Sequence, residues 1–191
     1  MKTNVSGPFL PIDSYLEEIV KQFHAKTQLI LEAPPGAGKT TRLPLALLFS
    51  PQFAQGQDIY VLVPRRPAAK LAASQAARLI GQRVGETVGY QFRFEKCGGA
   101  QTRLWYLTEG TFLRKFMADP TLKNVGAVIV DEFHERHLQG DVALALVKQL
   151  RRSRPEILLG VMSATIDDQS IKKYLETEKT AHIHLPESPH P

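Results

Sequence analysis

The chain has 191 residues, of which 43% are hydrophobic and 23% are charged, and its 24 lysines and arginines against 19 aspartates and glutamates give a formal net charge of +5. This length fits one ordinary domain, and the composition can bury a core, which excludes wholesale disorder. The single cysteine, Cys97, excludes an intrachain disulfide and a cysteine-based zinc cluster. We therefore expect a reducing compartment, the cytoplasm, and a polyanionic partner is compatible with the charge.

Membrane insertion is not expected from the apolar runs. The longest of them, such as residues 43–49, are far shorter than the roughly 18 residues that span a bilayer. The first residues lack the apolar stretch and cleavage site of a signal peptide. The sequence therefore predicts no membrane partner.

Hydrophobic periodicity predicts helices that alternate with short apolar strands. We expect helices at 14–25, 45–49, 67–80, 111–117, 140–150 and 168–177, the first with Ser14 and Glu17 spaced as a capping box. We expect strands at 28–32, 58–63, 87–92, 103–107, 127–130, 156–162 and 182–185. This alternation predicts right-handed βαβ units, and so an α/β fold with a mostly parallel sheet covered by helices on both faces.

A phosphate-binding loop is predicted between the first strand and the next helix, where residues 33–40 read APPGAGKT. Gly36 and Gly38 let the backbone curl so that amide groups face one centre at a helix N-terminus, and Lys39 adds a charge for the β- and γ-phosphates. Ala33 replaces the usual first glycine of the pattern. A plain connecting loop is the alternative, but it leaves the Gly-Lys-Thr order unexplained. The expected nucleotide-binding residues are Gly36, Ala37, Gly38, Lys39, Thr40 and Thr41.

Two carboxylates follow the apolar run 127–130, at the strand end where α/β sheets place ligands. Asp131 is positioned to hold Mg²⁺, directly or through water, together with the Thr40 hydroxyl. Glu132 would orient and deprotonate the water that attacks the γ-phosphate. By itself this pair fits an acidic helix start equally well, and the upstream phosphate loop favours catalysis.

Two other catalytic patterns fail on their spacing. His134 and His137 are three residues apart, whereas the zinc-binding pattern His-Glu-x-x-His separates its histidines by four. Ser163 lacks the Gly-x-Ser-x-Gly elbow of an esterase. Neither a metalloprotease nor an esterase is therefore favoured.

Five short motifs occur in an order that resembles the first RecA-like domain of superfamily 2 helicases. They are GAGKT at 36–40, VPRR at 63–66, TEG at 108–110, DEFH at 131–134 and SAT at 163–165. The Asp-Glu-x-His form resembles the DEAH/RHA group, and residues 131–146 most resemble the bacterial HrpB-type ATP-dependent helicases. The resemblance implies a RecA-like P-loop NTPase domain over 11–186, between an N-terminal tail at 1–10 and the start of a linker or a cut end at 187–191.

The resemblance also implies roles for individual residues, with ATP and Mg²⁺ as cofactors. The catalytic residues would be Lys39, Asp131, Glu132 and His134. The contacts to the nucleic-acid backbone would be Pro64, Arg65, Arg66, Thr108, Glu109 and Gly110. Ser163, Ala164 and Thr165 would couple the ATP site, through His134, to movement on the nucleic acid.

Some of these residues have other interpretations. Without the surrounding motifs, Arg65 and Arg66 would be a solvated helix start. Trp105 and Tyr106 lie on a predicted inner strand, so we expect them to pack in the core rather than to stack on bases. In the family an adenine-stacking arginine commonly follows Ala-Gln, whereas Ala-Ser-Gln stands at 73–75 here, ending at Gln75. Base selectivity therefore stays open.

The sequence thus predicts the N-terminal ATP-binding domain of an ATP-dependent helicase that acts on single-stranded RNA or DNA. A second RecA-like domain is the expected partner within the full-length protein. It would supply an arginine finger, which is worth about 10³ to 10⁵ in rate, so the chain alone is expected to bind nucleotide but to be catalytically incomplete. The alternatives are a non-catalytic adaptor that binds nucleotide or nucleic acid and a P-loop phosphotransferase.

Overall fold

The computed structural model describes residues 7–53, 55–165, 173–175 and 177–186. The strands are β1 (Gln28–Glu32), β2 (Asp58–Val63), β3 (Val88–Phe92), β4 (Glu95–Cys97), β5 (Leu104–Thr108), β6 (Val125–Val130), β7 (Leu158–Ser163) and β8 (Thr180–His184). The helices are α1 (Leu16–Lys26), α2 (Lys39–Leu48), α3 (Arg66–Leu79), α4 (Glu109–Ala118) and α5 (Leu138–Leu150), with short 3₁₀ turns η1 (Pro11–Ser14) and η2 (Phe133–Glu135).

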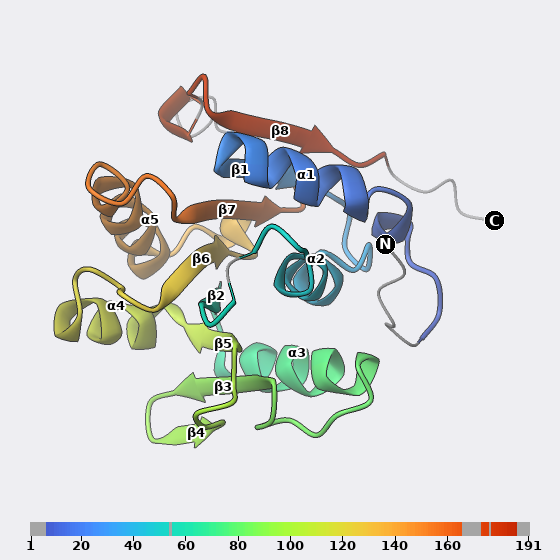
Figure 1. The fold of residues 1–191 in the computed structure, drawn as a ribbon, viewed down its shortest axis with the longest axis vertical. Helices are drawn as coiled ribbons and strands as arrows, with labels where there is room; N and C mark the ends of the chain where they lie inside the picture. Colours follow the sequence, from blue (N-terminus) through green and yellow to red (C-terminus); the bar gives the residue numbers. More distant parts are fainter. Residues whose placement is uncertain (1–6, 54, 166–172, 176, 187–191) are drawn as a thin grey trace.

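One sheet organises the molecule. Its eight strands follow the order β4-β3-β5-β2-β6-β7-β1-β8, and all neighbours are parallel except β3 and β4. One core cluster joins the sheet to α1, α2 and α3, and a second joins it to α4 and α5, so helices cover both faces (Figure 1). The strands β1, β6 and β7 are buried along their whole length, as expected for a sheet covered on both sides. The predicted α/β fold is therefore confirmed.

The parallel strands bring their carboxyl ends to one edge of the sheet. The phosphate loop follows β1, Pro64 follows β2, and Asp131 follows β6, while Thr108 and Ser163 are the last residues of β5 and β7. Five segments that are distant in sequence therefore meet along this edge because of the topology alone.

The first two helices begin elsewhere than predicted. The capping box of Ser14 and Glu17 is wrong, because Ser14 ends η1 and α1 begins at Leu16 with no side-chain cap. The Asp13 carboxylate instead accepts a hydrogen bond from the Leu10 amide at 2.8 Å. The predicted helix at 45–49 is the end of α2, which already begins at Lys39, directly after the phosphate loop.

Other boundaries differ for simple reasons. The short strand β4 was not predicted, since it is a three-residue partner of β3 with no apolar pattern of its own. Most of the predicted helix at 168–177 lies outside the described residues. Within that range, the described residues 173–175 are helical. In the described part of the chain, no helix combines the length and the apolar character needed to cross a bilayer.

Candidate functional site

The loop between β1 and α2 has the backbone of an anion-binding site. Gly36 and Gly38 have φ values of +77° and +95°, in the left-handed region that favours glycine. Nothing lies within 4 Å of a Cβ built at Gly36, whereas one built at Gly38 would lie 2.7 Å from Leu10 Cδ1. The first amides of α2 have no carbonyl four residues earlier in the helix, so they point their N–H groups at the loop.

Lys39 is held against this loop. Its side chain is buried, with the residue 4% exposed, and Nζ donates to the Ala33 carbonyl at 3.1 Å. An ammonium has three donors, so this one neutral acceptor leaves donors for an anion. Ala37 and Thr41 are buried on either side and pack the loop onto the core.

A hydrogen bond joins the loop to the acidic strand end. The Thr40 hydroxyl donates to Asp131 Oδ2 at 2.6 Å, and the Glu132 amide donates to Asp131 Oδ1 at 2.9 Å. Asp131 is only 1% exposed. Burial raises the pKa of Asp131 to about 6, against the opposing effects of the Thr40 hydrogen bond and the Lys39 charge. The Thr40 hydrogen bond therefore brings the two predicted motifs into direct contact.

The Thr40 hydroxyl and the Asp131 carboxylate are oxygen donors that fit a magnesium ion. A hydroxyl and a carboxylate are hard donors of the kind that Mg²⁺ prefers, and Mg²⁺ needs only one or two such protein ligands beside phosphate and water. A buried carboxylate with a raised pKa is stabilised by a nearby cation. Among the described residues, no group of three His, Cys, Asp or Glu is arranged to hold a metal.

Glu132 lies in a strained turn beside His134. Its φ of +53° is uncommon for a residue with a side chain. Glu132 Oε2 lies 3.3 Å from His134 Nε2, and the Ala164 amide donates to His134 Nδ1 at 3.4 Å. The imidazole therefore bridges the acidic turn and the segment after β7.

Ser163 connects that segment to the phosphate loop. It is fully buried, its carbonyl accepts the Ala33 amide at 3.0 Å, and its hydroxyl donates to the Thr165 carbonyl. The predicted coupling residues therefore contact both the phosphate loop and the acidic turn. Thr165 itself is exposed.

Tyr106 supports the start of α2, a role that sequence analysis missed. Pro44 lies inside α2 and has no N–H, so the Thr40 carbonyl four residues earlier lacks its helical donor. The Tyr106 hydroxyl supplies this hydrogen bond at 2.8 Å. Tyr106 and Trp105 are buried, as the sequence predicted, and burial together with the Asp131 charge raises the pKa of Tyr106.

A cavity of about 540 Å³ lies farther along the same edge of the sheet. Its described lining residues include the arginines Arg66, Arg93 and Arg114 and no carboxylate. Arg93 belongs to the turn between β3 and β4, where its guanidinium lies 4.7 Å from the ring centroid of the exposed Phe94. The other lining residues are Pro64, Thr108, Gly110, Thr111, Leu113 and Gln139. The cavity is therefore suited to phosphate and sugar groups.

Two of the predicted nucleic-acid contacts do not line this cavity. Arg65 donates to both carboxylate oxygens of Glu135 at 3.1 Å, although its side chain is 70% exposed. Glu109 is buried against the first turn of α5, where the Gly140 amide donates to it, and burial raises its pKa. Glu109 thus contacts the first turn of α5, and its contact with a nucleic acid stays a prediction.

Arg93, Arg114 and Gln139 were not predicted. Arg114 follows Gly110 by four residues, so the two share one face of α4, and this spacing was readable in the sequence. Arg93 stands beside an aromatic residue in a hairpin turn, which is a weak signal of nucleic-acid contact. No sequence pattern predicts that Gln139 lines this cavity, because its position depends on how α5 packs in the folded chain.

The comparisons with known proteins agree with this geometry. The DEAD/DEAH box helicase family model matches residues 14–174. The chain is 43% identical to the ATP-dependent RNA helicase HrpB of Escherichia coli over 167 residues, and 37% identical to the ATP-dependent RNA helicase HrpA of Borreliella burgdorferi over 174 residues. These matches cover 87% and 91% of this chain but only 20% and 21% of those proteins.

A solved structure gives the same result. The crystal structure of the Escherichia coli DEAH/RHA helicase HrpB superposes with a TM-score of 0.87 at 40% identity, over 94% of this chain and 22% of that one. The predicted RecA-like fold and the predicted family resemblance are therefore confirmed.

The raised pKa of Asp131 predicts an unusual pH dependence in Mg²⁺-free buffer. Its folded pKa of about 6 exceeds the ordinary value of 3.8, so the folded chain binds this proton more tightly. Protonation of Asp131 therefore raises the free energy of unfolding as the pH falls from 7.5 to 5, by on the order of 1 kcal/mol. This contribution is lost as the pH rises through 6. Urea unfolding at both pH values should show the gain in wild type relative to Asp131→Asn. An equal response of the two proteins would contradict the assignment.

Proposed function

The chain belongs to the DEAD/DEAH box helicase family, and from this premise we propose that it is the ATP-binding domain of a longer, ATP-dependent nucleic-acid helicase. The Thr40 to Asp131 hydrogen bond carries the proposal, because it brings the phosphate loop and the acidic strand end into direct contact. Lys39 and the first amides of α2 would bind the β- and γ-phosphates. Thr40 and Asp131 would hold Mg²⁺.

Hydrolysis would then depend on the neighbouring turn. Glu132 has a partly exposed side chain and lies within reach of solvent, so its carboxylate would accept the proton of the attacking water. Mg²⁺, when bound, would neutralise charge that develops on the phosphates. His134 would hold Glu132 in place and would transmit its position to Ala164 and the rest of the 163–165 segment.

The nucleic acid would run along the arginine-lined cavity. Arg66, Arg93 and Arg114 would bind backbone phosphates, which suits a motor that acts on any sequence. Both relatives are named RNA helicases, so we propose single-stranded RNA as the substrate and single-stranded DNA as the competing outcome. Arg65 would have to leave Glu135 before it could bind a phosphate.

A second RecA-like domain would complete the catalytic site. The chain spans about a fifth of the length of its curated relatives, so we propose that another part of the full protein supplies the arginine finger. A cytoplasmic location stays a prediction from the single cysteine.

Nucleotide binding by the 191-residue chain tests the phosphate loop. Calorimetry should show that Lys39→Ala weakens binding of Mg-ATP about tenfold or more, because charge-assisted hydrogen bonds to phosphate are lost. Lys21→Ala, at an exposed position of α1, is the matched control and should leave the affinity unchanged.

Glu132→Gln should bind Mg-ATP normally but lose ATP turnover about 100-fold or more in a protein extended through the second domain. Wild-type turnover in Glu132→Gln would remove its assigned role.

Salt-dependent RNA binding tests the arginine-lined cavity. The double change Arg93→Gln with Arg114→Gln should weaken binding of a fluorescent oligouridylate, measured by anisotropy in the presence of Mg-ATP. The slope of log K against log salt should fall by about 1.4, the value for two lost phosphate contacts on a single strand. Lys21→Gln with Arg78→Gln removes the same charge from exposed positions of α1 and α3 and should have little effect. Equal losses in both pairs would show that only net charge matters.

A further inference from the structure

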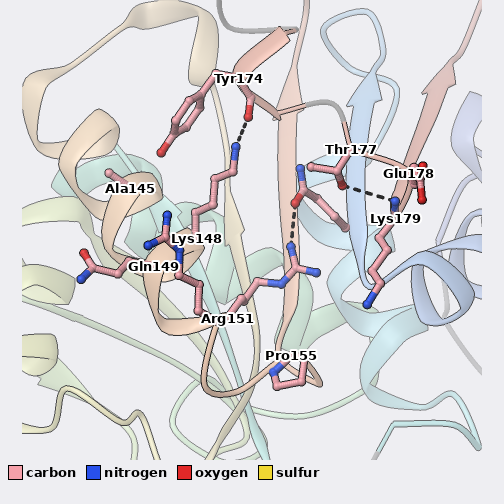
Figure 2. A pocket seen from close by; sticks show the side chains of 11 residues that line it. Ala145, Lys148, Gln149, Arg151, Pro155, Tyr174, Thr177, Glu178 and Lys179 are labelled. Carbon is pink, nitrogen blue, oxygen red and sulfur yellow. Dashed lines mark hydrogen bonds between the residues drawn. The ribbon is translucent and has the colours of Figure 1, made fainter.

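A larger cavity, of about 850 Å³, lies near the amino-terminal ends of β1 and β8 (Figure 2). Gln28 lines it at the start of β1, whereas the phosphate loop follows the end of that strand. Five residues of extended chain span about 16 Å, so the cavity is separate from the ATP site. Its other walls come from the end of α5, the turn after it and the segment before β8. We call it the basic pocket.

The basic pocket gathers cations from two separate segments. Lys148, Arg151 and Arg152 come from the end of α5 and its turn, and Lys179 comes from the segment before β8. The only carboxylate among the described lining residues is that of Glu178. Within the described part of the chain, none of these four cations has a carboxylate at ion-pair distance.

Arg151 is fixed at the base of the basic pocket. Its guanidinium, drawn in Figure 2, donates to two neutral acceptors, Gln28 Oε1 at 2.6 Å and Thr27 Oγ1 at 2.7 Å. Its Nε is buried and has no hydrogen-bond partner among the described residues. Burial lowers the pKa of Arg151, which means that its charge is poorly solvated.

Lys148 lies beside it in a similar environment. Its Nζ donates to the Tyr174 carbonyl and lies 3.7 Å from the centroid of the Tyr174 ring (Figure 2). Burial and the Arg151 charge both lower the pKa of Lys148. Two neighbouring cations that disfavour each other are stabilised when an anion binds between them.

Stabilisation of the helix dipole does not account for the whole arrangement. Cations at the C-terminus of α5 are favourable for the helix, and this explains Lys148. It does not explain Lys179, which reaches the same cavity from a different segment. Nor does it explain why Arg151 is held by neutral acceptors with a donor left over.

We propose that the basic pocket is a second anion site, distinct from the ATP site, that binds the phosphate groups of a nucleotide polyphosphate or of a nucleic-acid backbone. Lys148, Arg152 and Lys179 would bind the phosphates, and Arg151 would fix the base of the site. The volume lies in the range of small-ligand sites, about 300 to 1,000 Å³. The Tyr174 ring, in a residue that is 43% exposed, offers an apolar surface for a sugar or a base.

Amide NMR of the 191-residue chain tests this site without depending on the phosphate loop. Inorganic tripolyphosphate is titrated at constant ionic strength into the Lys39→Ala variant, with the amides of Gln149, Arg152 and Lys179 as reporters. We expect saturable shifts at these amides. Adding Lys148→Gln with Arg152→Gln should weaken the affinity about tenfold or more. Adding Lys21→Gln with Arg78→Gln, an equal loss of charge elsewhere, should leave it unchanged.

Two further measurements identify the ligand whose phosphates bind and provide a second variant in case the first does not fold. Mg²⁺-free ATP and a short oligouridylate replace tripolyphosphate, and tighter binding of either one supports the site and names its ligand. If the Lys148 and Arg152 changes unfold the chain, Lys179→Gln alone should still weaken binding, because only the backbone amide of Lys179 makes a hydrogen bond in the described structure. The proposal is overturned if the reporters do not shift at millimolar tripolyphosphate, if both charge-removal pairs weaken binding equally, or if polyglutamate binds and tripolyphosphate does not.

Discussion

The hydrogen bond from the Thr40 hydroxyl to Asp131 joins two segments that lie 91 positions apart in the sequence, and the candidate ATP site depends on it. The carboxylate is buried, so its charge must be stabilised locally, and the hydroxyl and the Glu132 amide do this in the protein alone. The same two side chains are the oxygen donors that we propose for Mg²⁺. Nucleotide binding would therefore exchange an internal hydrogen bond between the start of α2 and the end of β6 for metal coordination by the same two side chains.

The rest of the edge is built around this contact. Pro44 removes one hydrogen bond from α2, and Tyr106 of β5 restores it at Thr40, so β5 holds the residue that contacts Asp131. β5 ends at Thr108, which lines the arginine-rich cavity, and His134 extends the contact to Ala164. The proposed nucleotide and nucleic-acid sites thus contact the same elements of the fold.

Much of this arrangement was readable from the sequence, because it depends on short-range patterns. The glycines of the phosphate loop and the apolar runs before it and before Asp131 predict a parallel sheet with both motifs at one edge. Side-chain contacts across the fold were not readable. The link between Pro44 and Tyr106, the position of Gln139 and the burial of Glu109 against α5 all depend on which helix packs where. The capping box failed because Ser14 belongs to the turn η1, so that α1 begins only at Leu16.

A double-mutant cycle between Thr40 and Asp131 tests the central claim most directly. The quantity to measure is the gain in ATP affinity that Mg²⁺ confers, from calorimetry with and without the metal, in wild type, Thr40→Val, Asp131→Asn and the double variant. Because we assign both oxygens to one ion, each single change should remove most of this gain and the double change should remove little more. Independent, additive losses, or a full Mg²⁺-dependent gain in either single variant, would contradict the account.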